Sequence, residues 1–446
     1  MHATTDVRAE VSISTDKTIT VGALAKYCDE KGLGRAQFER IVACLDTHLV
    51  EQLCGEKYAR GNGDNRYQRA GSDDKPVVTI LGESTLSLSY VKDTQAADNE
   101  QTYFRPITEV LIFNGQKRYQ QCISVEAATV ATKTTYRETE AIGDRFTSMP
   151  SPATINRRVC EYGPKFQQQQ TEATEHRAVQ TVIPDGTKVH SQEENAFQNI
   201  SVTVSRPGVG DSHETTLLDV GVNTSWEKIA TTLSDRDAIA DDAAVVSDGE
   251  EAIKTAFCDG DREHQYDLVH LPRALGHKLR EDDQLPLEER NAYASELIGD
   301  ALHLKNSVAV HAPEDEWDAI RHRIATTEDR LQRTTRHLEL DGCWKAATFL
   351  RKWQPSILQF AEAALENRQI PWTSNGVERA MGAVSKRCKN KWMRWTERGL
   401  EALLNLRLLQ YAHPARYEKR AAELIGMPTA TAISLEVKSG GTRDKF

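Results

Sequence analysis

Two short apolar runs, each followed at once by an Asp-Gly pair, limit what this chain can fold into. Residues 182–184 are Val-Ile-Pro and lead to Asp185, and residues 245–247 are Val-Val-Ser and lead to Asp248. Such β-branched runs predict buried strands, so each aspartate is expected at the C-terminal end of a strand. Asp-Gly is also a common turn dipeptide, and either aspartate taken alone is more often a turn residue than a ligand.

A third carboxylate, Glu378, lies far downstream in Ser374–Arg379. The intervals between the three carboxylates are 62 and 129 residues. Hard divalent cations prefer oxygen ligands, so three converging carboxylates predict a site for two Mg²⁺ ions, with Mn²⁺ as the substitute. The alternative for Glu378 is structural, because it stands three residues after Asn375 and matches a capping box.

The pattern around these carboxylates predicts an α/β catalytic fold inside a multidomain α+β chain. Three strands in succession, then helices alternating with strands, is the order of an RNase H-like mixed sheet. From about Leu285 the strand signals stop, and apolar residues recur at helical spacing as far as Asn367. We expect an α-helical insertion there, which accounts for the long second interval.

An N-terminal helical region is expected to precede this core. Three short helices can be drawn between Ser124 and Gly163, the last with Ser151 as N-cap and Gly163-Pro164 as its stop. Arg157 and Arg158 on the last helix give the layout of a helix-turn-helix unit that would enter a major groove. An ordinary three-helix packing unit with solvated arginines is the alternative.

Six segments follow from these patterns. They are an N-terminal α+β region (1–122), a helix-turn-helix-like unit (123–170), the first part of the RNase H-like core (171–284), the α-helical insertion (285–370), core helices with a basic face (371–425) and a tail (426–446).

The distribution of charge and the cysteine content limit the classes of function that this chain can have. The 446 residues carry a net charge of −10, but residues 343–420 hold 15 Lys and Arg against 6 Asp and Glu. That segment therefore has a local net charge of +9, and the rest carries −19. Eight scattered cysteines without a CxxC pair suggest no disulfide framework. No apolar stretch approaches the roughly 20 residues of a membrane span, so a cytoplasmic, nucleoid-associated protein is expected.

The basic segment after Glu378 mixes cations with tryptophans. Its candidate DNA contacts are Lys386, Arg387, Lys389, Lys391, Arg394 and Arg398. Lysine and arginine neutralise phosphates, and a tryptophan can stack on an unpaired base. For Trp392 and Trp395 anchoring to the core is the favoured interpretation, whereas the cations favour double-stranded DNA.

Three stretches of sequence carry a family resemblance. Residues 373–382 (TSNGVERAMG), 386–389 (KRCK) and 395–401 (WTERGLE) resemble the region around the catalytic glutamate of DDE-class insertion-sequence transposases. The overall plan is similar to those of haloarchaea. The resemblance implies an RNase H-like catalytic domain in which Asp185, Asp248 and Glu378 hold Mg²⁺ for cleavage and strand transfer at element ends. It also implies a homodimer or larger synaptic complex on element-end and target DNA.

A second motif, Asp267-Leu-Val-His270, resembles the Asp-x-x-His motif of Mutator-like and hAT-like transposases. His270 could orient a phosphate or support the metal, with Asp267 as a helix N-cap in the alternative. A zinc site from Cys258, His264 and His270 is a further alternative. Two other functions stay open: an RNase H-like nuclease without strand transfer, and a non-catalytic helix-turn-helix DNA-binding protein.

Overall fold

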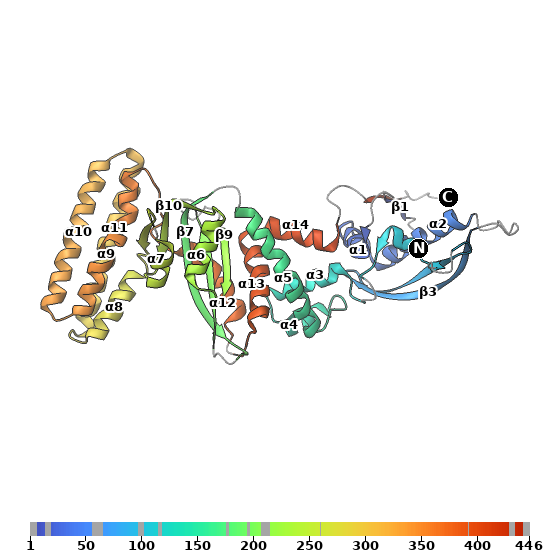
Figure 1. Cartoon of the computed structure of the whole chain (residues 1–446), viewed down its shortest axis with the longest axis horizontal. Coiled ribbons are helices and arrows are strands. Elements are labelled where there is room, and N and C mark those ends of the chain that lie inside the picture. Colours follow the sequence, from blue (N-terminus) through green and yellow to red (C-terminus); the bar gives the residue numbers. More distant parts are fainter. Residues whose placement is uncertain are drawn as a thin grey trace, which may run out of the picture. The chain divides into compact units, whose positions relative to one another are not determined.

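The computed structural model describes most of the chain. The described residues are 7–13, 19–55, 66–96, 102–114, 118–174, 178–193, 197–206, 215–258, 260–390, 392–427 and 433–439. The chain forms two compact units, Met1–Val159 with Glu418–Phe446, and Cys160–Tyr417. Figure 1 colours them along the sequence. The structure is mixed α/β, as predicted.

The first unit contains three small sheets. An antiparallel pair joins β1 (Val7–Ile13) to β12 (Ile433–Ser439), and a parallel pair joins β2 (Ile19–Thr20) to β6 (Leu111–Ile112). The third is antiparallel, with β3 (Tyr67–Thr79), β4 (Gly82–Asp93) and β5 (Tyr103–Phe104). The helices of this unit are α1 (Val21–Glu30), α2 (Arg35–Cys54), η1 (Pro106–Glu109), α3 (Gln121–Ala131) and α4 (Tyr136–Gly143). Two helices, α5 (Pro152–Thr174) and α14 (Pro414–Ile425), begin in one unit and end in the other.

The expected end of α5 at Gly163-Pro164 is wrong, because the helix continues through both residues to Thr174. Gly163 instead permits close packing. A Cβ there would lie 2.4 Å from the Cα of Ala402. The glycine is therefore required by a neighbouring helix, α13 (Glu397–Ala412), and does not signal a stop.

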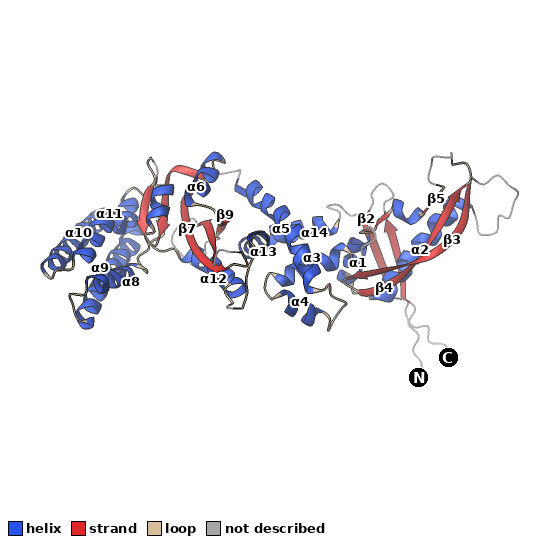
Figure 2. Cartoon of the chain, turned by 60° about the horizontal axis from the view of Figure 1, so that its bottom comes forward, coloured by secondary structure: helices blue, strands red, loops and turns tan. Residues whose placement is uncertain are grey.

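The second unit is built on a five-stranded mixed sheet of order β11-β10-β7-β8-β9. Its strands are β7 (Val179–His190), β8 (Phe197–Ser205), β9 (Thr216–Val222), β10 (Ile239–Ser247) and β11 (Glu263–Tyr266). β8 is antiparallel to both of its neighbours, whereas β10 is parallel to β7 and to β11. Figure 2 shows the sheet in red with helices around it.

Helices cover both faces of this sheet. On one face, α6 (Trp226–Asp235) and α7 (Glu251–Phe257) bury a cluster that includes Val182, Leu218, Ile229 and Phe257. On the other face, α12 (Asn375–Cys388) contacts β7 and β8, and α13 contacts β9. Because side chains alternate along a strand, odd-numbered residues near Val182 on β7 face α12.

The stretch predicted as a helical insertion is helical. It contains α9 (Leu287–His311), η2 (Ala312–Glu314), α10 (Trp317–Leu340) and α11 (Trp344–Leu365), and α8 (Leu271–Asp282) precedes it. α11 packs on β11, where the Tyr266 ring meets Phe349 at 5.9 Å and Trp353 at 5.3 Å between centroids. None of the described helices has the length and apolar character needed to cross a bilayer.

Candidate active site

Asp185 lies inside β7, and the expectation that it ends a strand is wrong. The strand continues to His190 because β8 pairs with it from Ile183 onward, with Asp185 opposite Val202. A turn at this Asp-Gly pair is thereby excluded. Asp185 shares the sheet face of Ile183, whose Cδ1 lies 3.6 Å from the position of a Cβ on Gly376 of α12. The strand therefore directs Asp185 toward the helix that carries Glu378.

Asp248 follows β10 directly, as the sequence predicts, and is exposed. Its Asp-Gly pair does form a turn: Asp248 Oδ1 accepts a hydrogen bond from the Glu250 amide at 3.3 Å. Gly249 has a φ of +87°, and a Cβ there would lie 2.3 Å from Cε2 of Tyr266. The turn thus needs glycine for both its conformation and its space, and it fixes Asp248 at the C-terminal end of β10.

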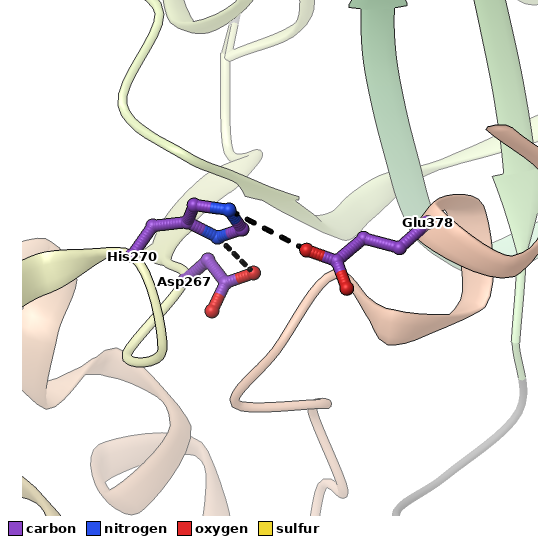
Figure 3. Close-up of side chains that lie close together, drawn as sticks. All are labelled: Asp267, His270 and Glu378. Carbon is purple, nitrogen blue, oxygen red and sulfur yellow. Dashed lines mark hydrogen bonds and ion pairs between the residues drawn. The ribbon is translucent and has the colours of Figure 1, made fainter. Parts of the chain in front are cut away.

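Glu378 lies in the first turn of α12, whose N-cap is Ser374. Asn375 is therefore the first helical residue, and no side chain caps the helix, so the capping-box alternative is wrong. The Glu378 carboxylate instead points toward His270, with Oε1 3.4 Å from Nε2 (Figure 3). An acid in the first turn is also favoured by the helix dipole.

His270 stands between two acids. Its Nδ1 lies 3.0 Å from Oδ2 of Asp267, and its other ring nitrogen, Nε2, faces Glu378 (Figure 3). Asp267 is fully buried and also accepts hydrogen bonds from the amides of Val269 at 2.8 Å and Ser374 at 2.9 Å. The Ser374 hydroxyl donates to it as well. Asp267 therefore holds both the imidazole and the start of α12.

Burial and neighbouring charged side chains change the pKa of Asp185. Burial raises its pKa to about 6, and the nearby charges of Asp248 and Glu378 add to the rise, while His270 opposes it. Asp248 and Glu378 therefore lie near enough to Asp185 for their charges to act on it. Of the three predicted residues, Glu378 alone belongs to the close ligand group of the described residues, where it joins Asp267 and His270.

The pKa values of Asp267 and His270 shift in opposite directions, that of Asp267 downward and that of His270 upward. Burial opposes ionisation of Asp267, but hydrogen bonds from His270, Ser374 and Val269 outweigh it and lower the pKa. The hydrogen bond to Asp267 raises the pKa of His270 against the effect of burial, and Glu378 and Asp248 add to the rise.

The donor set fits a divalent cation. Among the described residues, Asp267, His270 and Glu378 form a group whose ligand atoms lie within 4.8 Å of one another. The oxygens of Asp267 are already occupied by four donors, so we assign it to orienting His270 rather than to binding. A carboxylate that fixes an imidazole tautomer is a common support for a metal ligand.

The zinc alternative is wrong for the described residues. His264 is buried, its Nε2 lies 2.9 Å from Oγ of Ser247, and its ring packs 5.2 Å from Trp353. Burial lowers the pKa of His264 to about 3. This histidine belongs to the packing between β11 and α11, and it does not join Cys258 and His270 in a ligand group.

The basic segment is not one helix. α12 ends at Cys388, and α13 begins at Glu397. The exposed cations are Lys386, Lys389, Arg394 and Arg398. Arg387 is only 4% exposed and lies over the Trp395 ring at 5.1 Å, so it stabilises the fold and cannot reach DNA from there. Lys391 lies outside the described residues.

The two tryptophans of this segment differ. Trp395 is buried, as favoured, and anchors the segment: its indole donates to the Cys388 carbonyl at 3.2 Å and its amide donates to the His190 carbonyl at 2.9 Å. Trp392 is 81% exposed, so the anchoring interpretation is wrong for it.

The two adjacent arginines of α5 differ in their exposure to solvent. Arg157 is exposed, whereas Arg158 is 6% exposed and lies on the buried side with Ile155 and Val159. A DNA contact by Arg158 therefore does not fit its position. Ser151 does cap the helix, since its Oγ accepts from the Thr154 amide at 3.4 Å.

Ser374 is the site residue that sequence reasoning missed. Its only signal was its place directly before the first residue of a helix, where serine is frequent as an N-cap. Comparison of the chain with protein-family models and with curated proteins found no match.

Proposed function

We propose that this chain is a DDE-type transposase, a polynucleotidyl transferase that cuts and joins DNA at insertion-sequence ends. The observation that carries the proposal is that Asp248, at the end of β10, and Glu378, on α12, act through their charges on the pKa of Asp185 in β7. Carboxylates that act on one another in this way suit phosphodiester chemistry with hard cations.

The sheet supports an RNase H-like core. Numbered from β7, its strand order is 3-2-1-4-5, with the second strand antiparallel to the others. Candidate ligands on the first and fourth strands and on a later helix fit that architecture. The helices from Leu287 to Leu365 lie between Asp248 and Glu378, which is where the long interval between these two residues predicts an insertion.

The residues divide the work between binding and orientation. Asp185, Asp248 and Glu378 would hold two Mg²⁺ ions, which when bound supply charge neutralisation at the attacked phosphate. His270, with Nδ1 engaged by Asp267, presents Nε2 toward Glu378 and toward the same space. It is placed to hold a phosphate oxygen or to complete the ligand set. Asp267 and Ser374 position it without touching the DNA.

Exposed cations beside the site support a DNA path. Lys386, Lys389, Arg394 and Arg398 follow Glu378 within 20 residues of chain and face solvent. Their segment is tied by Trp395 to the end of β7, the strand of Asp185. Each phosphate neutralised on such a surface adds salt-dependent affinity.

The end-recognition part of the proposal rests on α3, α4 and α5. These three helices have the count and the short connections of a helix-turn-helix unit, and Arg157 is the exposed cation on the third. Paired cleavage at two element ends would require at least a dimer.

The test is cleavage of labelled DNA that carries the element ends, with Mg²⁺ or Mn²⁺. We expect cuts at the ends and joined products with the wild-type protein, and loss of both in Asp248→Ala and Glu378→Ala with DNA binding retained. Asp329→Ala is the matched control, because this acid is exposed and forms an ion pair with Arg333 on α10.

Two outcomes would favour the alternatives. Cleavage without joined products would indicate an RNase H-like nuclease. Binding that is insensitive to chelators, with no cleavage under either metal, would indicate a helix-turn-helix DNA-binding protein whose acidic residues are idle.

A further inference from the structure

The short strand β11 lies at the edge of the five-stranded sheet, where β10 is its one strand neighbour among the described residues. Its side chains bind residues of the helical insertion. Glu263 forms an ion pair with Arg368, with Oε2 2.6 Å from Nη2. The Gln265 side chain accepts a hydrogen bond from the Phe360 amide at 2.7 Å. The insertion therefore fixes a strand that backbone pairing holds on one side.

Trp353 of α11 contacts two elements that lie next to Asp248. Its ring centroid lies 5.2 Å from that of His264 and 5.3 Å from that of Tyr266, both on β11. The Lys254 ammonium, on the helix α7 that follows Asp248, lies 4.9 Å from the same indole centroid. Trp353 is only 4% exposed, so it belongs to the interior. One buried indole thus fixes β11 and α7 relative to each other.

The two β11 side chains that pack on this indole hold the residues directly before and after Asp248. His264 Nε2 lies 2.9 Å from Oγ of Ser247, and the same hydroxyl accepts a hydrogen bond from the Gly249 amide at 3.4 Å. The Tyr266 ring fills the space beside Gly249, where a Cβ would lie 2.3 Å from Cε2. The indole therefore reaches Asp248 through one intermediate side chain on each side.

We propose that Trp353 is a positioning residue for Asp248, and that the helical insertion thereby sets the affinity of the candidate site for its cations. The inference rests on the proposed function, since it takes Asp248 as a metal ligand. Asp248 is exposed at the end of β10, so its direction depends on the turn that carries it and on the side chains that support that turn. Groups that orient a ligand contribute to metal affinity without touching the metal.

The test is a titration of the whole protein with Mn²⁺, without DNA, followed by the electron paramagnetic resonance signal of the free ion. We expect Trp353→Ala to raise the Mn²⁺ Kd by roughly 10- to 100-fold, the usual effect of losing a group that orients a ligand. Tyr266→Leu should do the same, because the ring beside Gly249 is lost. Trp353→Phe should restore most of the affinity, since an aromatic ring again packs against β11.

Leu331→Ala is the matched control, because Leu331 is a buried side chain of the same insertion on α10, which packs on α9 and α11. Both alanine substitutions remove a large apolar side chain and should lower the Tm. Only Trp353→Ala should change the Mn²⁺ affinity when each protein is titrated well below its Tm. Circular dichroism at the titration temperature shows that each variant is folded. Trp353→Leu, which leaves a smaller cavity, replaces the alanine variant if that variant is unfolded.

Three results would overturn the inference alone: wild-type Mn²⁺ affinity in both Trp353→Ala and Tyr266→Leu, an equal loss of affinity in Leu331→Ala, or no recovery in Trp353→Phe. In each case the wild type binds Mn²⁺, and the proposed function stands. A wild-type protein that binds no Mn²⁺ would overturn the proposed cation site and the inference with it. Because the titration involves no cleavage, these two failures are distinguishable.

Discussion

The carboxylates that would bind cations are expected to destabilise the second unit when no cation is bound. Asp185 shows this most clearly, since its pKa rises from the ordinary 3.8 to about 6 through burial and the charges of Asp248 and Glu378. The folded protein then holds the Asp185 proton more tightly than the unfolded chain does. This group favours folding below about pH 4, and that contribution is lost as the pH rises through about 6.

The size of the effect follows from the pKa. A rise from 3.8 to about 6 corresponds to about 3 kcal/mol at neutral pH. Asp185 is only partly buried, so solvent screening reduces this to about 1–2 kcal/mol. Asp185→Asn removes the charge and keeps the acceptor for the Gly186 amide, which lies 2.7 Å from Oδ1. The variant should therefore be more stable than wild type by that amount at pH 7.5 without metal.

The assay is thermal unfolding across pH 4–8, with and without Mg²⁺. A gain of 1–2 kcal/mol corresponds to a rise in Tm of roughly 2–8 °C for a unit of this size, absent at pH 4. Saturating Mg²⁺ should stabilise wild type by about 3 kcal/mol at 100 times its Kd, and the variant much less.

Asp219→Asn is the matched control. Burial also raises the pKa of Asp219 to about 6, with Arg236 opposing, but this residue lies on β9, and the nearby acid that adds to the rise is Glu401 rather than Asp248 or Glu378. It should gain stability at neutral pH with no change in the response to Mg²⁺. An Asp185→Asn variant that is less stable than wild type at pH 7.5, or equally stabilised by Mg²⁺, would refute the reasoning.

Three further outcomes are expected. Gly249→Ala should lower the free energy of unfolding in urea by about 2–4 kcal/mol, because the new Cβ would clash with the Tyr266 ring and the residue keeps a positive φ. An unchanged urea midpoint would contradict the turn geometry. Ser374→Ala should lower the free energy of unfolding by about 1–3 kcal/mol, since Asp267 loses a hydrogen-bond donor. It should also weaken Mn²⁺ binding by roughly 10- to 100-fold in calorimetry. Retained Mn²⁺ affinity would argue against Asp267 as the group that orients His270. His270 has a raised pKa, so its pairing stabilises the fold below about pH 6.5 and is lost as the pH rises through the folded pKa; His270→Gln should flatten that part of the pH profile of Tm.

Local signals were sufficient where the chain's own pattern decides the structure. The apolar run before Asp248 ends a strand as predicted, and the helical spacing after Leu285 corresponds to three long helices. The strand through Asp185 could not be bounded, because its second half exists only by pairing with β8. The end of a strand cannot be predicted from its own sequence where pairing with another strand decides it.

Charged residues gave the other misjudgements. Arg158 and Arg387 were assigned to DNA because arginine is usually exposed, yet both are buried. Arg387 packs on Trp395, and burial of an arginine stem beside an indole depends on residues that meet only after folding. For the same reason Trp392 could not be distinguished from Trp395 by composition.

The attachment of Trp395 to the end of β7 has a consequence for solubility. β10 pairs with β7 only as far as Val245 opposite Val182, so beyond that point this side of β7 would present unpaired backbone groups. Trp395 occupies the end of this edge by accepting from the Gln192 amide at 2.8 Å and donating to His190. Open strand edges recruit strands from other molecules. The basic segment therefore withholds the last backbone groups of this edge, at His190 and Gln192, from pairing with a strand of another molecule.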